Sequence, residues 1–303
     1  MLNVFKLGYA EFITKDVEAL LHYYTEVIGL SLVERAEDGT AYISSCQDHH
    51  NIILRESDNS RLQTIGWQLD RNLSLKEVQG YLRSHGIASE IKSDAQPGVA
   101  ELLELSDPDE NTVHLYQTME LSRPGFRNRG IVPNKLGHIA LCSRNAKQVV
   151  EFYKEVLGFV ITDRMLDVAN FMTCNHDHHT LNVVSAQKSL MHHIAFELRG
   201  AGHQYHSSDL LVQNNIPILW GPSRHTAGHN IASYHHDPDK HIIELFTSMD
   251  IYLPELGYME PRPWHKDLPQ KPKVWDTLSY WGTEYGFNLA SVIEEKTLLV
   301  QKK

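Results

Sequence analysis

The sequence predicts an α+β fold in which one small module, a strand, a helix and then several strands, is used four times. Three observations support this prediction. The second half of the chain repeats the first, each half contains two such segments in a row, and each segment has one helical pattern among short apolar or alternating runs. With 303 residues, the chain is long enough for two domains of two modules each.

The repeat is clearest in the first module of each half. Leu7-Gly8-Tyr9 matches Leu136-Gly137-His138 at an offset of 129 residues, and Asp48-His49-His50 matches Asp177-His178-His179 at the same offset. Between residues 7 and 54, 11 of 48 positions are identical without a gap, and most others keep their apolar or polar character. We therefore expect both halves to share one scaffold.

A second module follows in each half. Ile65-Gly66-Trp67 introduces it in the first half and His192-His193-Ile194 in the second, with offsets that drift from 126 to 130 because the loops differ in length. The Pro124-Gly125 turn signal lies between the halves. The predicted organisation is an N-terminal domain (1–121), a linker (122–134), a C-terminal domain (135–248) and a C-terminal arm (249–303).

Local patterns place the elements of the second half. Asn145 is suited to cap a helix over 146–157 that Gly158 ends, and a second helical segment covers 209–214. A module of this kind cannot cover its own sheet face, so we expect two modules to pair around a shared cavity. Strands are predicted at 137–142, 170–174, 181–185, 193–198, 231–234 and 241–246.

Composition excludes several classes of partner. The net charge of −10 argues against a nucleic-acid surface and an anionic membrane face, so a small-molecule partner is expected. No apolar run approaches the roughly 18 residues of a spanning helix, and the first residues lack a signal-peptide pattern, so we expect a cytoplasmic protein. Three widely spaced cysteines do not suggest a thiolate metal site, whereas the 19 histidines leave imidazole and carboxylate as metal-binding chemistry.

Comparing equivalent positions of the two halves singles out a candidate metal site. Tyr9 corresponds to His138, Trp67 to His193, and His114 to Glu244, so only the second half assembles two histidines and one carboxylate. This set occupies one face of an octahedral metal and leaves positions open for substrate and dioxygen. No metal is predicted in the first half, where a phenol and an indole replace two ligands.

Motifs along almost the whole chain resemble one family. Together they resemble the type I extradiol ring-cleaving dioxygenases (catechol 2,3-dioxygenases) of the vicinal oxygen chelate superfamily, inactive first half included. The resemblance implies the fold of that superfamily, with His138, His193 and Glu244 as ligands of Fe(II) or, less often, Mn(II). The motifs are, in order, Leu136-Gly137-His138-Ile139, His178-His179-Thr180, His192-His193-Ile194, Gly221-Pro222-Ser223-Arg224-His225, Tyr234, Asp237-Pro238-Asp239 and Glu244.

The resemblance also implies roles for four further residues. His179 matches the acid–base histidine beside the dioxygen site, although His50 holds the same position in the half expected to lack metal. His225 and Tyr234 match residues that hydrogen-bond the substrate, and Phe171 matches an aromatic wall of the substrate pocket. The implied reaction cleaves a catechol ring beside its two hydroxyls with dioxygen. It gives a product of the 2-hydroxymuconic-semialdehyde type that contains both oxygen atoms.

The segment after residue 248 is rich in aromatic residues and proline. It resembles the C-terminal segment of the homoprotocatechuate 2,3-dioxygenase branch, in which such a tail helps cover the site; packing between subunits is the alternative, and 294–303 is expected to be a solvated end. The resemblance further implies a homo-oligomer, with a tetramer favoured. Ala227 and Gly228 stand where biphenyl-diol enzymes tend to carry polar residues, so the preferred catechol or trihydroxybenzene stays open.

Two other functions fit the same architecture. One is a glyoxalase-like isomerase or other metal lyase, which shares the modules without needing His179 and Tyr234. The other is a metal-free ligand-binding protein, which the two histidines and the carboxylate disfavour.

Overall fold

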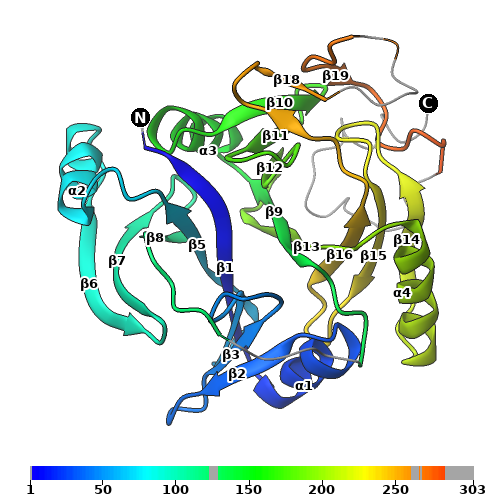
Figure 1. Cartoon of the computed structure of the whole chain (residues 1–303), viewed down its shortest axis with the longest axis horizontal. Helices are drawn as coiled ribbons and strands as arrows, with labels where there is room; N and C mark the ends of the chain where they lie inside the picture. The colour runs from blue at the N-terminus through cyan, green and yellow to red at the C-terminus, as the bar shows by residue number, and fades with distance from the viewer. Residues whose placement is uncertain (1, 123–128, 261–265, 267, 284–303) are drawn as a thin grey trace.

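Two large β-sheets lie side by side in the computed structural model of the chain, one from each half of the sequence (Figure 1). The structure describes residues 2–122, 129–260, 266 and 268–283. Residues 123–128 of the predicted linker and the predicted solvated end at 294–303 therefore lie outside the described residues.

The first sheet has eight strands in the order β2-β3-β4-β1-β5-β8-β7-β6. Its helices are α1 (Val17–His22), which continues into the π-helical turn η1 (Tyr23–Val27), and α2 (Leu75–Ser84). Its strands are β1 (Val4–Thr14), β2 (Ser31–Arg35), β3 (Ala41–Ser44), β4 (Ile52–Glu56), β5 (Arg61–Leu69), β6 (Ser89–Gln96), β7 (Val99–Ser106) and β8 (Thr112–Tyr116).

The second sheet has nine strands in the order β14-β15-β16-β13-β9-β12-β11-β10-β19. Its helices are α3 (Ala146–Glu151), continued by the π-helical turn η2 (Phe152–Val156), and α4 (Ala201–Gln213). A two-stranded sheet of β17 (Tyr252–Leu253) and β18 (Tyr258–Met259) lies in the arm. The other strands are β9 (Lys135–Ser143), β10 (Val160–Met165), β11 (Ala169–Thr173), β12 (Leu181–Ser185), β13 (Leu190–Glu197), β14 (Ile218–Arg224), β15 (Ile231–His236), β16 (Ile242–Thr247) and β19 (Val274–Trp275).

The strand orders show that the predicted module is used four times. Each sheet contains two βαβββ units joined through their first strands, β1 to β5 and β9 to β13, and the two orders correspond strand for strand apart from β19. The predicted α+β architecture of the vicinal oxygen chelate type is confirmed. The domain boundaries at 121, 134 and 248 stay predictions.

Several local predictions needed correction. The predicted 146–157 helix divides into α3 and η2, and Asn145 occupies the N-cap position without a capping hydrogen bond; its side chain instead donates to Asp109 Oδ1 at 2.9 Å. The helix predicted over 209–214 begins earlier, at Ala201. The prediction missed its first turns because they carry glycine, serine and histidine instead of a periodic apolar pattern. Strands β10 and β14 were not predicted.

The two halves share one hydrophobic core. Tyr24 of η1 packs its ring against Phe196 of β13, with centroids 6.3 Å apart, and Tyr153 of η2 packs against Trp67 of β5 at 6.0 Å. Each half thus inserts the helical segment of its first module against the sheet of the other half, which fixes the relative position of the sheets.

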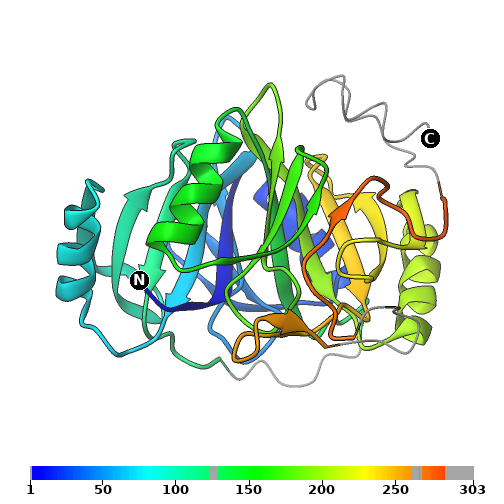
Figure 2. The same cartoon turned by 90° about the horizontal axis from the view of Figure 1, so that it is seen from above.

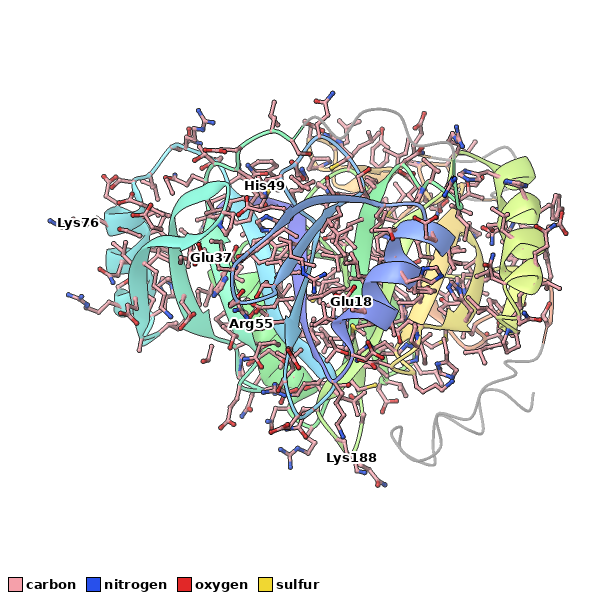
Figure 3. The ribbon with its side chains drawn as sticks, turned by 90° about the horizontal axis from the view of Figure 1, so that it is seen from below. Glu18, Glu37, His49, Arg55, Lys76 and Lys188 are labelled. Atoms are coloured by element: carbon pink, nitrogen blue, oxygen red, sulfur yellow. The ribbon has the colours of Figure 1, made fainter. Side chains whose placement is uncertain are left out.

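Charged side chains cover the outside of this core. Glu18, Glu37, Lys76 and Lys188 are exposed, and Figure 3 shows them on α1, in the turn between β2 and β3, on α2 and in the turn between β12 and β13. Among the described residues, no helix combines the length and apolar character needed to span a bilayer.

Candidate metal centre

Three adjacent strands bring together the two histidines and the carboxylate predicted from the sequence. His138 lies on β9, His193 on β13 and Glu244 on β16, neighbours at the middle of the second sheet. The register places Ala195 opposite both His138 and Glu244, while His193 lies two residues before Ala195 on the same face of β13. All three side chains are at most 6 % exposed.

The three facing atoms form a nearly equilateral triangle. His138 Nε2 lies 3.2 Å from His193 Nε2 and 3.1 Å from Glu244 Oε2, and the third side of the triangle measures 3.0 Å. Neighbouring ligands of an octahedral ion are separated by √2 times the metal–ligand distance, which is about 3.0 Å for bonds of about 2.1 Å. The donor set therefore fits one face of an octahedral divalent metal, and it is the one such group among the described residues.

Electrostatics prepare these groups to act as ligands. Burial raises the pKa of Glu244, but His138 and His193 outweigh that effect and hold it well below its usual value, so the carboxylate is an anion at neutral pH. Burial also lowers the pKa of His193, which favours the neutral imidazole that a metal requires.

Other buried side chains orient these groups. Asn230 donates to Glu244 Oε1 at 2.9 Å, Tyr234 donates to Glu244 Oε2 at 2.7 Å, and His192 Nδ1 lies 2.6 Å from His193 Nδ1. The bare Cα of Gly137 admits the ring of Phe246, which a Cβ there would meet at 2.5 Å, and Phe246 in turn packs on His138. Partners that hold ligands in this way tune metal affinity.

The predicted acid–base and substrate residues surround the triangle. The His179 ring centroid lies 4.4 Å from that of His138 and 5.1 Å from that of Phe171. On the opposite side, His225 Nε2 lies 2.9 Å from Tyr234 Oη. All seven predicted site residues therefore gather in one buried region, and burial lowers the pKa of both His179 and His225.

The first half has a different set at the equivalent positions. The offset of 129 holds through the strand pairing, so the counterpart of His193 is Thr64, and the predicted match of Trp67 with His193 was wrong. Trp67 instead corresponds to Phe196 at the interface between the halves. Tyr9 Oη and His114 Nδ1 lie 2.7 Å apart and share a hydrogen bond. Tyr9 is the counterpart of His138, and His114 is the counterpart of Glu244.

The C-terminal arm joins the two edges of the second sheet. Its strand β19 pairs with the edge strand β10, and five residues further on Tyr280 N donates to Arg224 O in the other edge strand, β14. Between these points Leu278 O accepts from Thr226 N, beside His225. Figure 2 shows this segment crossing the second sheet.

Sequence reasoning missed several residues of the site. Asn230, which binds the carboxylate, precedes Tyr234 by four residues, or two strand periods, but an asparagine at a strand start has no distinctive signal. Asp163, in the unpredicted strand β10, lies 3.2 Å from His178, the neighbour of His179. Its position at the same offset from Glu34 was the one available signal.

A family model matches both halves of the chain. The Glyoxalase/Bleomycin resistance protein/Dioxygenase superfamily matches residues 6–115 and 135–245. The chain belongs to this superfamily.

Individual relatives have low sequence identity to this chain. The manganese-dependent 2,3-dihydroxybiphenyl 1,2-dioxygenase of Geobacillus genomosp. 3 is 22% identical, over 90% of this chain and 94% of its own. The biphenyl-2,3-diol 1,2-dioxygenase of Pseudomonas sp. (strain KKS102) is 27% identical, over 78% and 87% respectively.

Solved structures of members share the fold. Homoprotocatechuate 2,3-dioxygenase from Brevibacterium fuscum, in an anaerobic substrate complex, has a TM-score of 0.77 at 22% identity and covers 93% of this chain and 89% of its own. The Mn(II)-bound glyoxalase from Novosphingobium aromaticivorans has a TM-score of 0.77 at 27% identity and covers 83% and 84%.

Proposed function

We propose that this superfamily member is an extradiol dioxygenase that cleaves the ring of a catechol-type substrate with dioxygen. The observation that carries the proposal is the triangle of His138 Nε2, His193 Nε2 and Glu244 Oε2, with sides of 3.0–3.2 Å and with His179 on one flank. The names of the two relatives, both dioxygenases of aromatic diols, support the same reaction. Adding O2 to the ring places both oxygen atoms in a product of the 2-hydroxymuconic-semialdehyde type.

His138, His193 and Glu244 are the proposed ligands of Fe(II) or Mn(II). A bound ion of this kind supplies open positions for the two catechol oxygens and for dioxygen, and a route for electrons between them. Two neutral imidazoles and one carboxylate leave the loaded site with one net positive charge, which favours a deprotonated catechol oxygen.

His179 is the proposed acid–base residue. Its Nδ1 lies 3.1 Å from His178 Nδ1, so Nε2 is the nitrogen available to a substrate. Because burial holds its pKa well below the ordinary value, the imidazole is neutral at pH 7 and can take a proton from a catechol hydroxyl at Nε2. The same nitrogen then returns that proton later in the reaction.

Tyr234 and His225 form the proposed hydrogen-bonding side of the site. Tyr234 donates to Glu244 Oε2 at 2.7 Å, and His225 Nε2 lies 2.9 Å from Tyr234 Oη. Both side chains therefore lie beside the carboxylate, where negative charge would develop on substrate oxygen. Phe171, with its ring next to His179, is the proposed wall for the aromatic ring.

The glyoxalase-like alternative is kept because one structural neighbour is named a Mn(II)-bound glyoxalase. The metal ligands alone do not distinguish these functions. Reconstitution of the chain with Fe(II) or Mn(II) without oxygen, followed by catechol, 3-methylcatechol or 2,3-dihydroxybiphenyl and then air, separates them. Oxygen uptake with a yellow product supports ring cleavage. No uptake across this panel, together with isomerisation of a glutathione hemithioacetal, contradicts it.

Cellular context completes the proposal. A homo-oligomer, with a tetramer favoured, follows from the family resemblance, and a cytoplasmic location from the sequence pattern described above. Domains at 1–121 and 135–248, followed by an arm at 249–303 that covers the site or packs between subunits, are supported by the two sheets and by β19. Limited proteolysis tests the boundaries, and sedimentation tests the subunit number.

A further inference from the structure

Asn182, on β12, has a buried side-chain amide whose oxygen no described residue satisfies. The residue is 9 % exposed, and its Oδ1 makes no hydrogen bond with the described part of the chain. A buried acceptor without a partner costs free energy, and asparagine is also disfavoured in strands. The partner of this amide is therefore expected outside the chain, as a ligand or as a water molecule that a ligand displaces.

The register of four adjacent strands places this amide beside the proposed site. Phe171 of β11 lies opposite Asn182, Asn182 lies next to Ala140 of β9, and Ala140 lies opposite His193 of β13. Figure 1 shows these four strands side by side. Residues that are paired in this way point to the same face of a sheet. Asn182 thus shares its face with a proposed metal ligand and with the proposed aromatic wall.

The alternation along β12 agrees with this orientation. Leu181 and Val183 belong to the core that the two halves share, whereas Val184 packs in a separate cluster with Phe171. Because side chains of a strand alternate between its two faces, Asn182 points to the same side as Val184.

Only a small side chain separates Asn182 from the metal ligand in this row. Ala140, which lies between Asn182 and His193, contributes a methyl group. Neighbouring strands are about 4.8 Å apart, so the backbones at Asn182 and His193 are separated by roughly 10 Å. A single aromatic ring held near His193 can therefore reach the amide with one of its substituents.

The first half shows that the fold does not need an amide at this position. At the offset of 129, Ile53 is the counterpart of Asn182 and Tyr42 is the counterpart of Phe171, and these two residues again lie opposite each other. Ile53 is 1 % exposed and packs in a cluster with Tyr42 and Tyr9. The amide therefore distinguishes the half that contains the proposed metal ligands.

The chemistry of the amide limits the group that it can bind. An amide presents its oxygen or, after half a rotation, its NH2 group, and a hydroxyl can meet either because it both donates and accepts. A methyl group meets neither, and a carboxylate meets only the NH2 group. The nearest residues on this face, Phe171, Ala140 and Val184, carry no positive charge, so a carboxylate would be buried there without a counter-charge.

We propose that Asn182 is a specificity-determining residue that binds a hydroxyl substituent on the ring of the catechol. The inference rests on the proposed function and narrows its substrate class to catechols with a further hydroxyl group, the trihydroxybenzenes. Alkylcatechols fit less well, because the amide gives up water without gaining a hydrogen bond.

Two variants of the same shape and one matched control test this assignment. Asn182→Val removes the hydrogen-bonding group, Asn182→Thr keeps one, and Ile53→Val makes the same residue at the equivalent position of the first half. Thermal unfolding of the metal-free proteins comes first. We expect the Tm of Asn182→Val to equal or exceed that of Asn182→Thr, because no described group of the protein bonds Oδ1. A higher Tm in Asn182→Thr would show a partner within the protein and overturns the proposal.

The second measurement is ligand binding without turnover. Calorimetry of the Mn(II)-loaded proteins without oxygen compares pyrogallol with 3-methylcatechol and 1,2,4-trihydroxybenzene with 4-methylcatechol, pairs that exchange a hydroxyl for a methyl group. In at least one pair we expect the wild type to prefer the hydroxyl compound. This preference should fall by roughly 10–100-fold in Asn182→Val, the effect of one buried hydrogen-bonding partner, and by less in Asn182→Thr. It should be unchanged in Ile53→Val.

Two results of this measurement overturn the proposal. One is a ratio of affinities in Asn182→Val that equals the wild-type ratio for both pairs. The other is binding of 2,3- or 3,4-dihydroxybenzoate that is tighter than that of either trihydroxybenzene and depends on Asn182, which would assign the amide to a carboxylate.

Oxygen uptake by the same proteins in air separates this inference from the proposed function. If binding depends on Asn182 as expected while no compound of the panel consumes oxygen, the proposed function fails and the binding role stands. If ring cleavage occurs and Asn182→Val keeps the wild-type preference, the proposed function stands and the role of Asn182 fails.

Discussion

A single carboxylate sets the charge of the proposed metal centre. Glu244 stays ionised although it is buried, because His138 and His193 depress its pKa, and Asn230 binds its second oxygen. Glu244→Gln keeps the size but replaces one accepting oxygen by an NH2 group and removes the charge. We expect Mn(II) affinity, measured by isothermal titration calorimetry, to fall by more than the roughly 10–100-fold that loss of a supporting hydrogen bond costs.

The control for this prediction lies in the first half. His114 is the counterpart of Glu244 and contacts Tyr9, so His114→Gln changes the equivalent strand position without touching the proposed ligands. Mn(II) affinity should be unchanged in this variant. Retained affinity in Glu244→Gln, or equal loss in His114→Gln, contradicts the assignment of the ligands.

His179 should separate metal binding from turnover. The residue packs beside His138 without joining the triangle of donor atoms. His179→Gln should therefore retain metal by elemental analysis, while kcat for ring cleavage falls by roughly 10²–10⁴-fold, the contribution of a positioned acid–base group. His50→Gln, at the equivalent site, should leave kcat per loaded protein unchanged. Full metal content with undiminished turnover in His179→Gln refutes the role.

Comparison between the two halves could find residues whose chemistry differs between the copies. It singled out His138 and Glu244, because Tyr9 and His114 stand at their counterparts. It did not find Asn230 or Asp163, whose importance comes from contacts made across the sheet. A hydrogen bond to a residue on a neighbouring strand has no signature in the sequence around an asparagine.

At the scale of elements, the position of β9 depends on one glycine. The ring of Phe246 occupies the space where a Cβ of Gly137 would lie, at 2.5 Å, and it also packs on His138. Gly137→Ala should displace β9 or Phe246, destabilise the fold by roughly 1–3 kcal/mol and weaken Mn(II) binding although no ligand is changed. Denaturant unfolding and calorimetry measure the two effects.

Gly8, the counterpart of Gly137, is the matched control. A Cβ there would lie 1.8 Å from Tyr116 Oη, so Gly8→Ala should also destabilise the fold. Because no proposed ligand lies next to this strand position, metal affinity should stay unchanged in the folded variant. Equal weakening of Mn(II) binding in both variants would show a general loss of stability instead of an effect on β9.

The strands predicted from the sequence are the ones with strong apolar or alternating runs, such as β12, whose bounds of Leu181–Ser185 agree fully. β10 contains Asp163 and Arg164 and lies at the sheet edge beside the arm, so its apolar pattern is weak.

The match of Trp67 with His193 was wrong because the similarity of short strand starts does not define register. Only pairing with Glu11 and Ala140 identifies Thr64 as the counterpart.

At the scale of the whole molecule, the interface between the halves contains a titratable group. Tyr23 Oη lies 2.6 Å from His235 Nε2, and both side chains are buried. Burial lowers the pKa of His235 from 6.5 to about 3, so the folded protein holds this imidazole neutral in its hydrogen bond with Tyr23. Packing of η1 against the second sheet thus depends on an uncharged histidine.

This interface predicts a loss of stability in acid. The folded-state pKa of His235 lies below its unfolded value, so the unfolded chain binds more protons and the stabilisation is complete only above about pH 6.5. As pH falls from 6.5 towards 4, this histidine alone should lower the free energy of unfolding by up to about 1.4 kcal/mol per pH unit. Urea unfolding of metal-free wild type and His235→Gln across this range measures the difference in the slope of unfolding free energy against pH.

His22→Gln, at an exposed position on α1, is the control and should keep the wild-type slope. A wild-type slope in His235→Gln would mean that the histidine becomes protonated without separating the two halves.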